Sequence, residues 1–161
     1  IADSVFTDNV AYYGGAIANE GTLVLQGSAI TNGLALDGTA IWNTGNVEVT
    51  DSNFQSNQAF GAGGGAIWNN KVLAVSGSTF SNNSSTEDGG AIWNDNMLTV
   101  SGSTFSDNSA DRNGGAVFSS GEASLDKTEF LSNSATRSGG GVFSDGTLTI
   151  RGSDFVENDA G

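Results

Sequence analysis

Alternating apolar and variable positions recur in short stretches along the whole chain. In one stretch Leu98 and Val100 are apolar, whereas Thr99 between them is polar, and the same pattern returns every 24 to 26 residues. Successive side chains of a β-strand point to opposite faces, so this pattern predicts short strands with one buried face. The two apolar columns consist of Leu23, Val47, Leu73, Leu98, Ala123 and Leu148, and of Leu25, Val49, Val75, Val100, Leu125 and Ile150.

Two short motifs repeat in step with these stretches. The first is Gly-Gly-Ala-Ile, which occurs or is closely matched at 14–17, 38–41, 64–67, 89–92, 114–117 and 139–142. The second is Phe-x-x-Asn, which pairs Phe6, Phe54, Phe80, Phe105, Phe130 and Phe155 with Asn9, Asn57, Asn83, Asn108, Asn133 and Asn158. In the second unit Ile30 and Gly33 take the places of Phe and Asn.

One structural unit of about 25 residues is therefore used about six times. A unit with three short strands and three turns is typical of one coil of a parallel β-helix. A propeller blade needs about 40 residues or more, and no segment has the spacing of an amphipathic helix. We therefore predict a single all-β domain over residues 1–161, a parallel β-helix (β-solenoid) with three strands per coil. Coils stacked ~4.8 Å apart would form a rod of roughly 30 Å.

Stacking would turn each column into a ladder of like side chains. We expect Phe54, Phe80, Phe105, Phe130 and Phe155 to stack inside the coils, beside the two apolar columns. The corner ladder would contain Asn57, Asn83, Asn108, Asn133 and Asn158, whose amides can bond the coils above and below. Paired glycines indicate places where the backbone conformation or a close approach excludes a Cβ. These motifs predict a shape rather than a chemistry.

The same two motifs resemble the polymorphic outer-membrane protein repeats, which build the passenger domains of chlamydial autotransporters and occur in other large secreted proteins. The resemblance covers the chain from Phe6 to Asn158. It implies a right-handed β-helix that is secreted or displayed at the cell surface, in association with the outer membrane, and that takes part in adhesion. The second coil departs from the motifs at Ile30, Gly33 and Thr39.

Composition narrows the range of functions. The chain carries 18 Asp and Glu against 5 Lys and Arg, and this net charge of −13 disfavours nucleic acids and anionic membranes as partners. No apolar run approaches the ~20 residues that span a bilayer, so we expect no direct membrane insertion. The chain contains neither Cys nor His, which removes the commonest general base and the commonest transition-metal ligands. We therefore expect no cofactor and no enzymatic activity.

The position after the Gly-Gly-Ala-Ile motif is the strongest candidate for binding. It holds Ala18, Trp42, Trp68, Trp93, Phe118 and Phe143. If the preceding Ile or Val points inward, these side chains point outward and form an aromatic stripe. Such a stripe could bind a glycan or a protein. Alternatively, the rings only stack on one another beneath the loops, or the strand has the opposite parity and the rings are buried.

Three further functions depend on particular polar residues. Glu87, Asp88, Asp107 and Asp111 could hold Ca²⁺ through their carboxylates, although the chain lacks the glycine-rich nonapeptide of calcium-binding β-rolls. Outward Thr79 and Thr104 could start an ice-binding rank, but Glu129 and Asp154 break it. A polysaccharide-degrading site would need clustered acids beside a basic residue, and the sequence shows no such cluster.

We therefore expect a rigid stalk or adhesive passenger segment of a larger secreted or surface protein, with a ligand-binding module as the alternative. Its partner would be a protein or glycan on a host or neighbouring cell. Both termini fall within a coil, so we expect the chain to be an excerpt of a longer array. Open strand edges at the two end coils would also allow end-to-end self-association.

Overall fold

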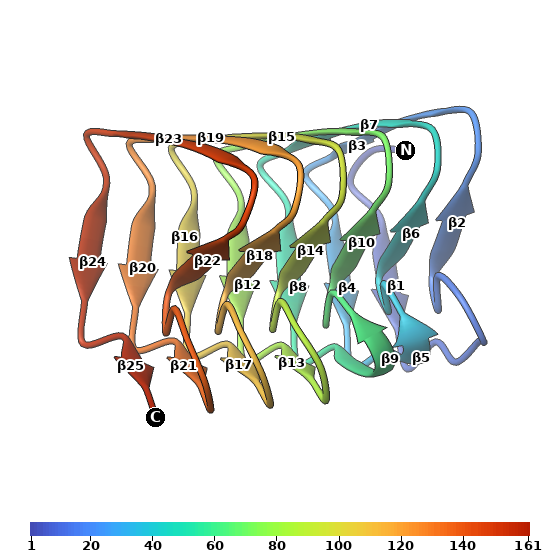
Figure 1. Ribbon diagram of the computed structural model, residues 1–161. Helices are drawn as coiled ribbons and strands as arrows, with labels where there is room; N and C mark the ends of the chain where they lie inside the picture. Colours follow the sequence, from blue (N-terminus) through green and yellow to red (C-terminus); the bar gives the residue numbers. More distant parts are fainter.

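The computed structural model describes residues 1–161, and its strands wind around one axis as a stack of coils (Figure 1). All strand pairing is parallel and joins each coil to the next, so the strands line up into four sheets along the axis. The predicted parallel β-helix is confirmed. Three of the sheets take their names from the side chains that they carry.

The Phe sheet contains β1 (Val5–Thr7), β4 (Ala29–Thr31), β8 (Asn53–Gln55), β12 (Thr79–Ser81), β16 (Thr104–Ser106), β20 (Glu129–Leu131) and β24 (Asp154–Val156). The Trp sheet contains β2 (Ile17–Asn19), β6 (Ile41–Asn43), β10 (Ile67–Asn69), β14 (Ile92–Asn94), β18 (Val117–Ser119) and β22 (Val142–Ser144). The Leu/Val sheet contains β3 (Thr22–Gln26), β7 (Asn46–Thr50), β11 (Val72–Ser76), β15 (Met97–Ser101), β19 (Glu122–Asp126) and β23 (Thr147–Arg151). The fourth sheet contains β5 (Leu34–Asp37), β9 (Gln58–Gly63), β13 (Ser84–Ser85), β17 (Ser109–Ala110), β21 (Ser134–Ala135) and β25 (Asp159–Ala160).

The prediction of three strands per coil is wrong, because the turn after each Phe strand also pairs with its neighbours. In the later coils this fourth strand has only two residues, as in Ser84–Ser85. A two-residue strand is too short to show an alternating pattern in the sequence. Pairing across coils still satisfies its backbone hydrogen-bonding groups.

Strands pair in register, so equivalent side chains lie directly above one another. Phe80, for example, pairs with Phe54 on one side and Phe105 on the other. One irregularity interrupts this regular stacking: between β5 and β9 the register shifts after Ala35. The sequence periodicity of 24 to 26 residues is thus the length of one coil.

The core is a column of stacked apolar side chains. Phe54, Phe80, Phe105 and Phe130 are fully buried, and the ring centroids of successive members lie 4.6 to 5.1 Å apart. Phe155 continues the stack at 4.6 Å from Phe130 but is 43% exposed, since it lies in the last coil. Burial of four phenylalanine side chains contributes on the order of 10 kcal/mol before the entropic costs of folding.

Three ladders of polar side chains join the coils inside the corners. In the Phe-x-x-Asn corner, Asn83 Nδ2 donates to Asn108 Oδ1 (2.9 Å) and to the carbonyl of Phe54 (3.0 Å). The same arrangement links Asn57, Asn83, Asn108, Asn133 and Asn158. The sequence indicated this ladder. It did not indicate the other two.

The second ladder follows the Trp strands, where Asn43 Nδ2 donates to Asn69 Oδ1 and Asn69 Nδ2 to Asn94 Oδ1, both at 2.7 Å. The third joins serines, and the backbone N–H of Ser78 donates to Ser103 Oγ at 3.1 Å. All five of these side chains are buried. A buried amide or hydroxyl is stable only when it is hydrogen-bonded, so each coil depends on the next for its polar groups.

The two glycines of the repeated pair have different tasks. The first, such as Gly89, has a φ of +67°, a left-handed conformation that costs other residues energy. The second, such as Gly90, lies where an added Cβ would be 2.0 Å from the carbonyl oxygen of Gly115 in the next coil. One glycine therefore allows the turn and the other allows the coils to approach.

Candidate functional site

The aromatic column lies on the outer side of the Trp sheet. Ile41, Ile67 and Ile92 point into the core and are fully buried, which turns the intervening ring of each strand outward. Opposite parity, with the rings in the core, does not occur. The aromatic stack, as we call it, consists of Tyr13, Trp42, Trp68, Trp93, Phe118 and Phe143.

Neighbouring rings of the aromatic stack are nearly parallel. The ring centroids of Trp42 and Trp68 lie 5.5 Å apart with 7° between the planes, and those of Trp68 and Trp93 lie 5.2 Å apart with 2°. Tyr13 extends the stack, at 5.7 Å from Trp42, in the coil where the column itself holds Ala18. Tyr13 was not predicted from the sequence, because it precedes the motif instead of following it.

Stacking limits what the column can offer a ligand. Each inner ring has a neighbour on both faces, so only ring edges face outward. Trp42, Trp68, Trp93 and Phe143 are partly buried. Phe118 is buried, at 9% exposure, so its expected place in an exposed stripe is wrong. A phenyl ring extends less far from the strand than an indole, and Phe118 lies between two stacked neighbours.

The end of β9 covers one side of the aromatic stack at Trp93. Gly63 pairs with Asp88 in the next coil, and a Cβ added to Gly63 would lie 2.9 Å from Trp93 Cδ1. The chain therefore passes directly over the indole at this point. In the sequence, the need for glycine at position 63 is visible only as a third glycine before the usual pair.

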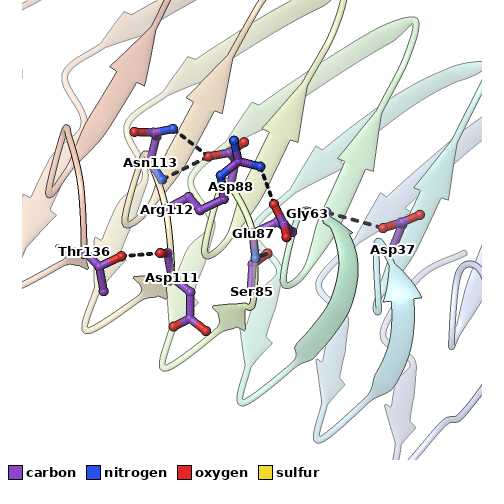
Figure 2. A network of polar contacts seen from close by, with 9 residues as sticks. All are labelled: Asp37, Gly63, Ser85, Glu87, Asp88, Asp111, Arg112, Asn113 and Thr136. Carbon is purple, nitrogen blue, oxygen red and sulfur yellow. Dashed lines mark hydrogen bonds and ion pairs between the residues drawn. The ribbon is translucent and has the colours of Figure 1, made fainter.

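Polar contacts join these turns along the axis (Figure 2). Arg112 forms an ion pair with Glu87 of the previous coil, and both side chains are about 40% exposed. Asp88 accepts hydrogen bonds from the backbone N–H (3.0 Å) and the amide (2.9 Å) of Asn113. Thr136 donates to the carbonyl of Asp111. The network ties consecutive turns together and gives Glu87 and Asp88 partners within the chain.

Two ionisable groups on this side of the molecule have shifted pKa values. Burial raises the pKa of Asp37, and hydrogen bonds from the backbone N–H groups of Gly63 and Ala62 partly oppose the shift. The hydrogen bond to Glu87, together with the charges of Asp88 and Glu87, raises the pKa of Arg112 above its ordinary value. Both shifts follow from contacts between adjacent coils.

Comparison with protein families gives one match: the model described as a right-handed β-helix region covers residues 1–161. The chain belongs to this family. Comparisons with curated proteins and with solved structures found no significant match. The right-handed β-helix family contains both polysaccharide-degrading enzymes and proteins that are not enzymes, so membership alone does not assign an activity.

The remaining candidate residues of this β-helix lie apart from one another. No group of three or more Asp or Glu side chains is close enough together to hold a metal ion. Among the candidate calcium ligands, Asp107 forms a left-handed corner with a φ of +54°. Thr79 donates to Asn53 Oδ1 (2.8 Å) on the outer side of the Phe sheet, where Glu129 replaces threonine two coils later. No helix in the chain is long and apolar enough to cross a membrane.

An exposed apolar face on the fourth sheet of the β-helix was not predicted. Val10, Tyr12, Leu34, Leu36 and Phe60 line a shallow hollow beside β5 and β9. A second shallow hollow lies over β3, β7 and β11. Aliphatic and aromatic residues at the turn positions of the first three coils were the available signal, since later coils have Ser, Thr or Asp there.

Proposed function

We propose that this β-helix is a rigid, non-catalytic structural and adhesive segment of a larger secreted or cell-surface protein. The observation that supports the structural role is the in-register stacking of the core, together with the asparagine ladder that runs without a break from Asn57 to Asn158. Nearly every repeated residue contributes to this stacking. The residues left free to vary lie in the turns and on the outer faces.

Rigidity follows from how the coils are joined. Bending the rod would open the hydrogen bonds between strands on one side, together with those of the buried asparagine ladders. Each buried group left without a partner costs about 1–3 kcal/mol. Such a rod can hold a binding surface at a fixed distance from an anchor, which is the task of a stalk.

Surface display is the second part of the proposal. It rests on the resemblance of the Gly-Gly-Ala-Ile and Phe-x-x-Asn motifs to the repeats of autotransporter passengers. The partners we propose are proteins or glycans of a host or neighbouring cell. The proposal needs no cofactor.

Both parts can be tested separately. Small-angle scattering of the chain should match the profile calculated from the straight stack of coils, and a profile that requires bent or separated coils would contradict the structural role. Antibodies raised against the chain should label intact cells that produce the protein. Labelling that appears only after the cells are broken open would contradict surface display.

A ligand-binding module is a second candidate, favoured by the partly exposed indole edges of Trp42, Trp68 and Trp93. If these edges bind a glycan, Trp68→Ala and Trp93→Ala should abolish binding on a glycan array. Phe80→Leu, which changes the core on a different sheet, is the control. Binding that is unchanged in both Trp variants would remove this candidate.

A further inference from the structure

The fourth sheet of the first three coils carries an exposed apolar surface, the N-terminal apolar face. It consists of Val10, Tyr12, Leu34, Leu36 and Phe60. Val10 is 71% exposed, Tyr12 73% and Phe60 47%. Figure 1 shows β5 and β9 side by side at one end of the lower row of strands. Leu34 is 37% exposed as well, whereas Leu36 is partly buried.

This face is apolar only in part of the rod. Along one outward column, Val10 and Leu34 are followed in register by Gln58 and Ser84. The neighbouring column likewise changes from Phe60 to polar residues in the later coils. Shape alone does not require this change, since the later coils fold with polar residues at the same places. A large apolar surface confined to one stretch marks an interaction site.

The charge around the face indicates what kind of partner fits. Residues 1–70 contain six acidic residues and neither Lys nor Arg. Asp8 follows the Phe strand β1 two residues before Val10, and Asp37 ends β5 directly after Leu36. Exposed aromatic rings also attract Lys and Arg side chains through their negative faces. Cationic groups are therefore favoured, and anionic ones are repelled.

The size of the face indicates a short segment. Five side chains spread over three coils extend roughly 10–15 Å along the axis. A stable interface between folded proteins uses about 20–30 residues on each side. A second copy of this chain would also bring its own charge of −13 toward a stretch that carries six acidic residues and neither Lys nor Arg.

We propose that the N-terminal apolar face binds a short, basic amphipathic polypeptide segment. Its apolar side chains lie in the hollow between Tyr12, Leu34 and Phe60, and its Lys or Arg side chains lie over the rings and beside Asp8. This binding is independent of the proposed role as a spacer, because it uses a lateral surface that the ladders do not require.

The probe is a fluorescein-labelled peptide of eight residues in which Leu and Lys alternate, titrated with the full chain and followed by fluorescence anisotropy. We expect saturable binding that weakens as the salt concentration rises. Phe60→Ser should weaken binding about tenfold or more, because it removes a large apolar contact. Asp8→Asn should weaken it severalfold and keep the fold, since Asn tolerates the left-handed φ of +56° at this corner.

Met97→Ser is the matched control, because Met97 is 44% exposed on the Leu/Val sheet, away from the face. It should bind the peptide like the original chain. A peptide with Glu in place of Lys should not bind. Circular dichroism spectra of all variants establish that they are folded.

Three results would overturn the proposal. One is the absence of saturable binding, and another is equal binding by Phe60→Ser and the original chain. The third is a dimer, seen by sedimentation, that Phe60→Ser dissociates, because the occupant would then be a second copy. None of these results depends on whether the rod is rigid or displayed on a cell.

Discussion

Replacing Asn108 by Ala should remove more stability than its small change in size suggests. Asn108 Oδ1 accepts hydrogen bonds from the backbone N–H (3.0 Å) and the amide (2.9 Å) of Asn83. Its Nδ2 donates to the carbonyl of Phe80 (3.0 Å) and to Asn133 Oδ1 (2.9 Å). The Asn108→Ala variant loses all four of these hydrogen bonds, which link three consecutive coils.

The magnitude follows from what each lost bond leaves behind. The N–H of Asn83 becomes a buried donor without a partner, which costs about 1–3 kcal/mol. The three other bonds contribute about 0.5–1.5 kcal/mol each, so the free energy of unfolding should fall by roughly 3–7 kcal/mol. Asn70 is exposed and makes no side-chain hydrogen bond, so Asn70→Ala should change the free energy of unfolding by about 0.5 kcal/mol or less.

Urea unfolding followed by far-UV circular dichroism gives the two free energies. The coils of a repeat protein can unfold separately, so hydrogen exchange should be measured beside urea unfolding to show which coils lose protection. We expect the amide proton of Asn83 to lose protection in Asn108→Ala, while amides in distant coils keep theirs. A loss below about 1 kcal/mol with Asn83 still protected would refute the assigned role of the asparagine ladder.

Three other substitutions test separate features. Gly90→Ala should destabilise the chain by about 3 kcal/mol or more in urea unfolding, because the added Cβ would meet the carbonyl of Gly115. Gly102→Ala should cost only about 1–2 kcal/mol, because its Cβ meets no atom and only the left-handed φ is unfavourable. Equal losses of stability in the two variants would contradict this distinction. Because the folded-state pKa of Asp37 is raised, its stabilising contribution is present at low pH and declines as pH rises through that pKa. Asp37→Asn should therefore melt higher at neutral pH, with the difference shrinking toward pH 3, and a difference that grows on acidification would show the opposite sign. Trp68→Phe should be neutral or stabilising in thermal melts, because it keeps a ring in the stack and removes a buried indole N–H without a hydrogen-bond partner; a clear loss would mean that the indole itself is needed.

Much of the fold could be predicted because the same sequence pattern occurs about six times. One strand such as Leu98–Val100 is a weak signal, but in-register recurrence identifies both the strand and its neighbours. The Phe and Asn of the Phe-x-x-Asn motif recur at a fixed separation, which led to the prediction that Phe105 and Asn108 lie inside. Both are buried. The two-residue strands of the fourth sheet escaped prediction, since their pairing depends on neighbouring coils and not on a local pattern.

The buried asparagines of the Trp strands show a different limit. Asn69 lies two residues after Ile67, so strand alternation places both on the inside. Polarity suggests the opposite, and only a matching amide in the adjacent coil resolves the conflict. The exposure of the aromatic stack could not be predicted from the sequence either. Alternation gives the direction of Trp93, but the turn that covers it belongs to another coil.

Parallel pairing between adjacent coils also sets how the chain can fold. No side-chain hydrogen bond joins residues more than 29 positions apart, although the molecule contains 161 residues. Each coil therefore closes a loop of similar length, and the entropy lost in doing so depends only weakly on that length. A completed coil presents strand edges with unpaired N–H and C=O groups, with which the next stretch can pair. The chain can thus fold progressively, in the order in which its coils emerge, and further coils would not slow the closure of any one of them.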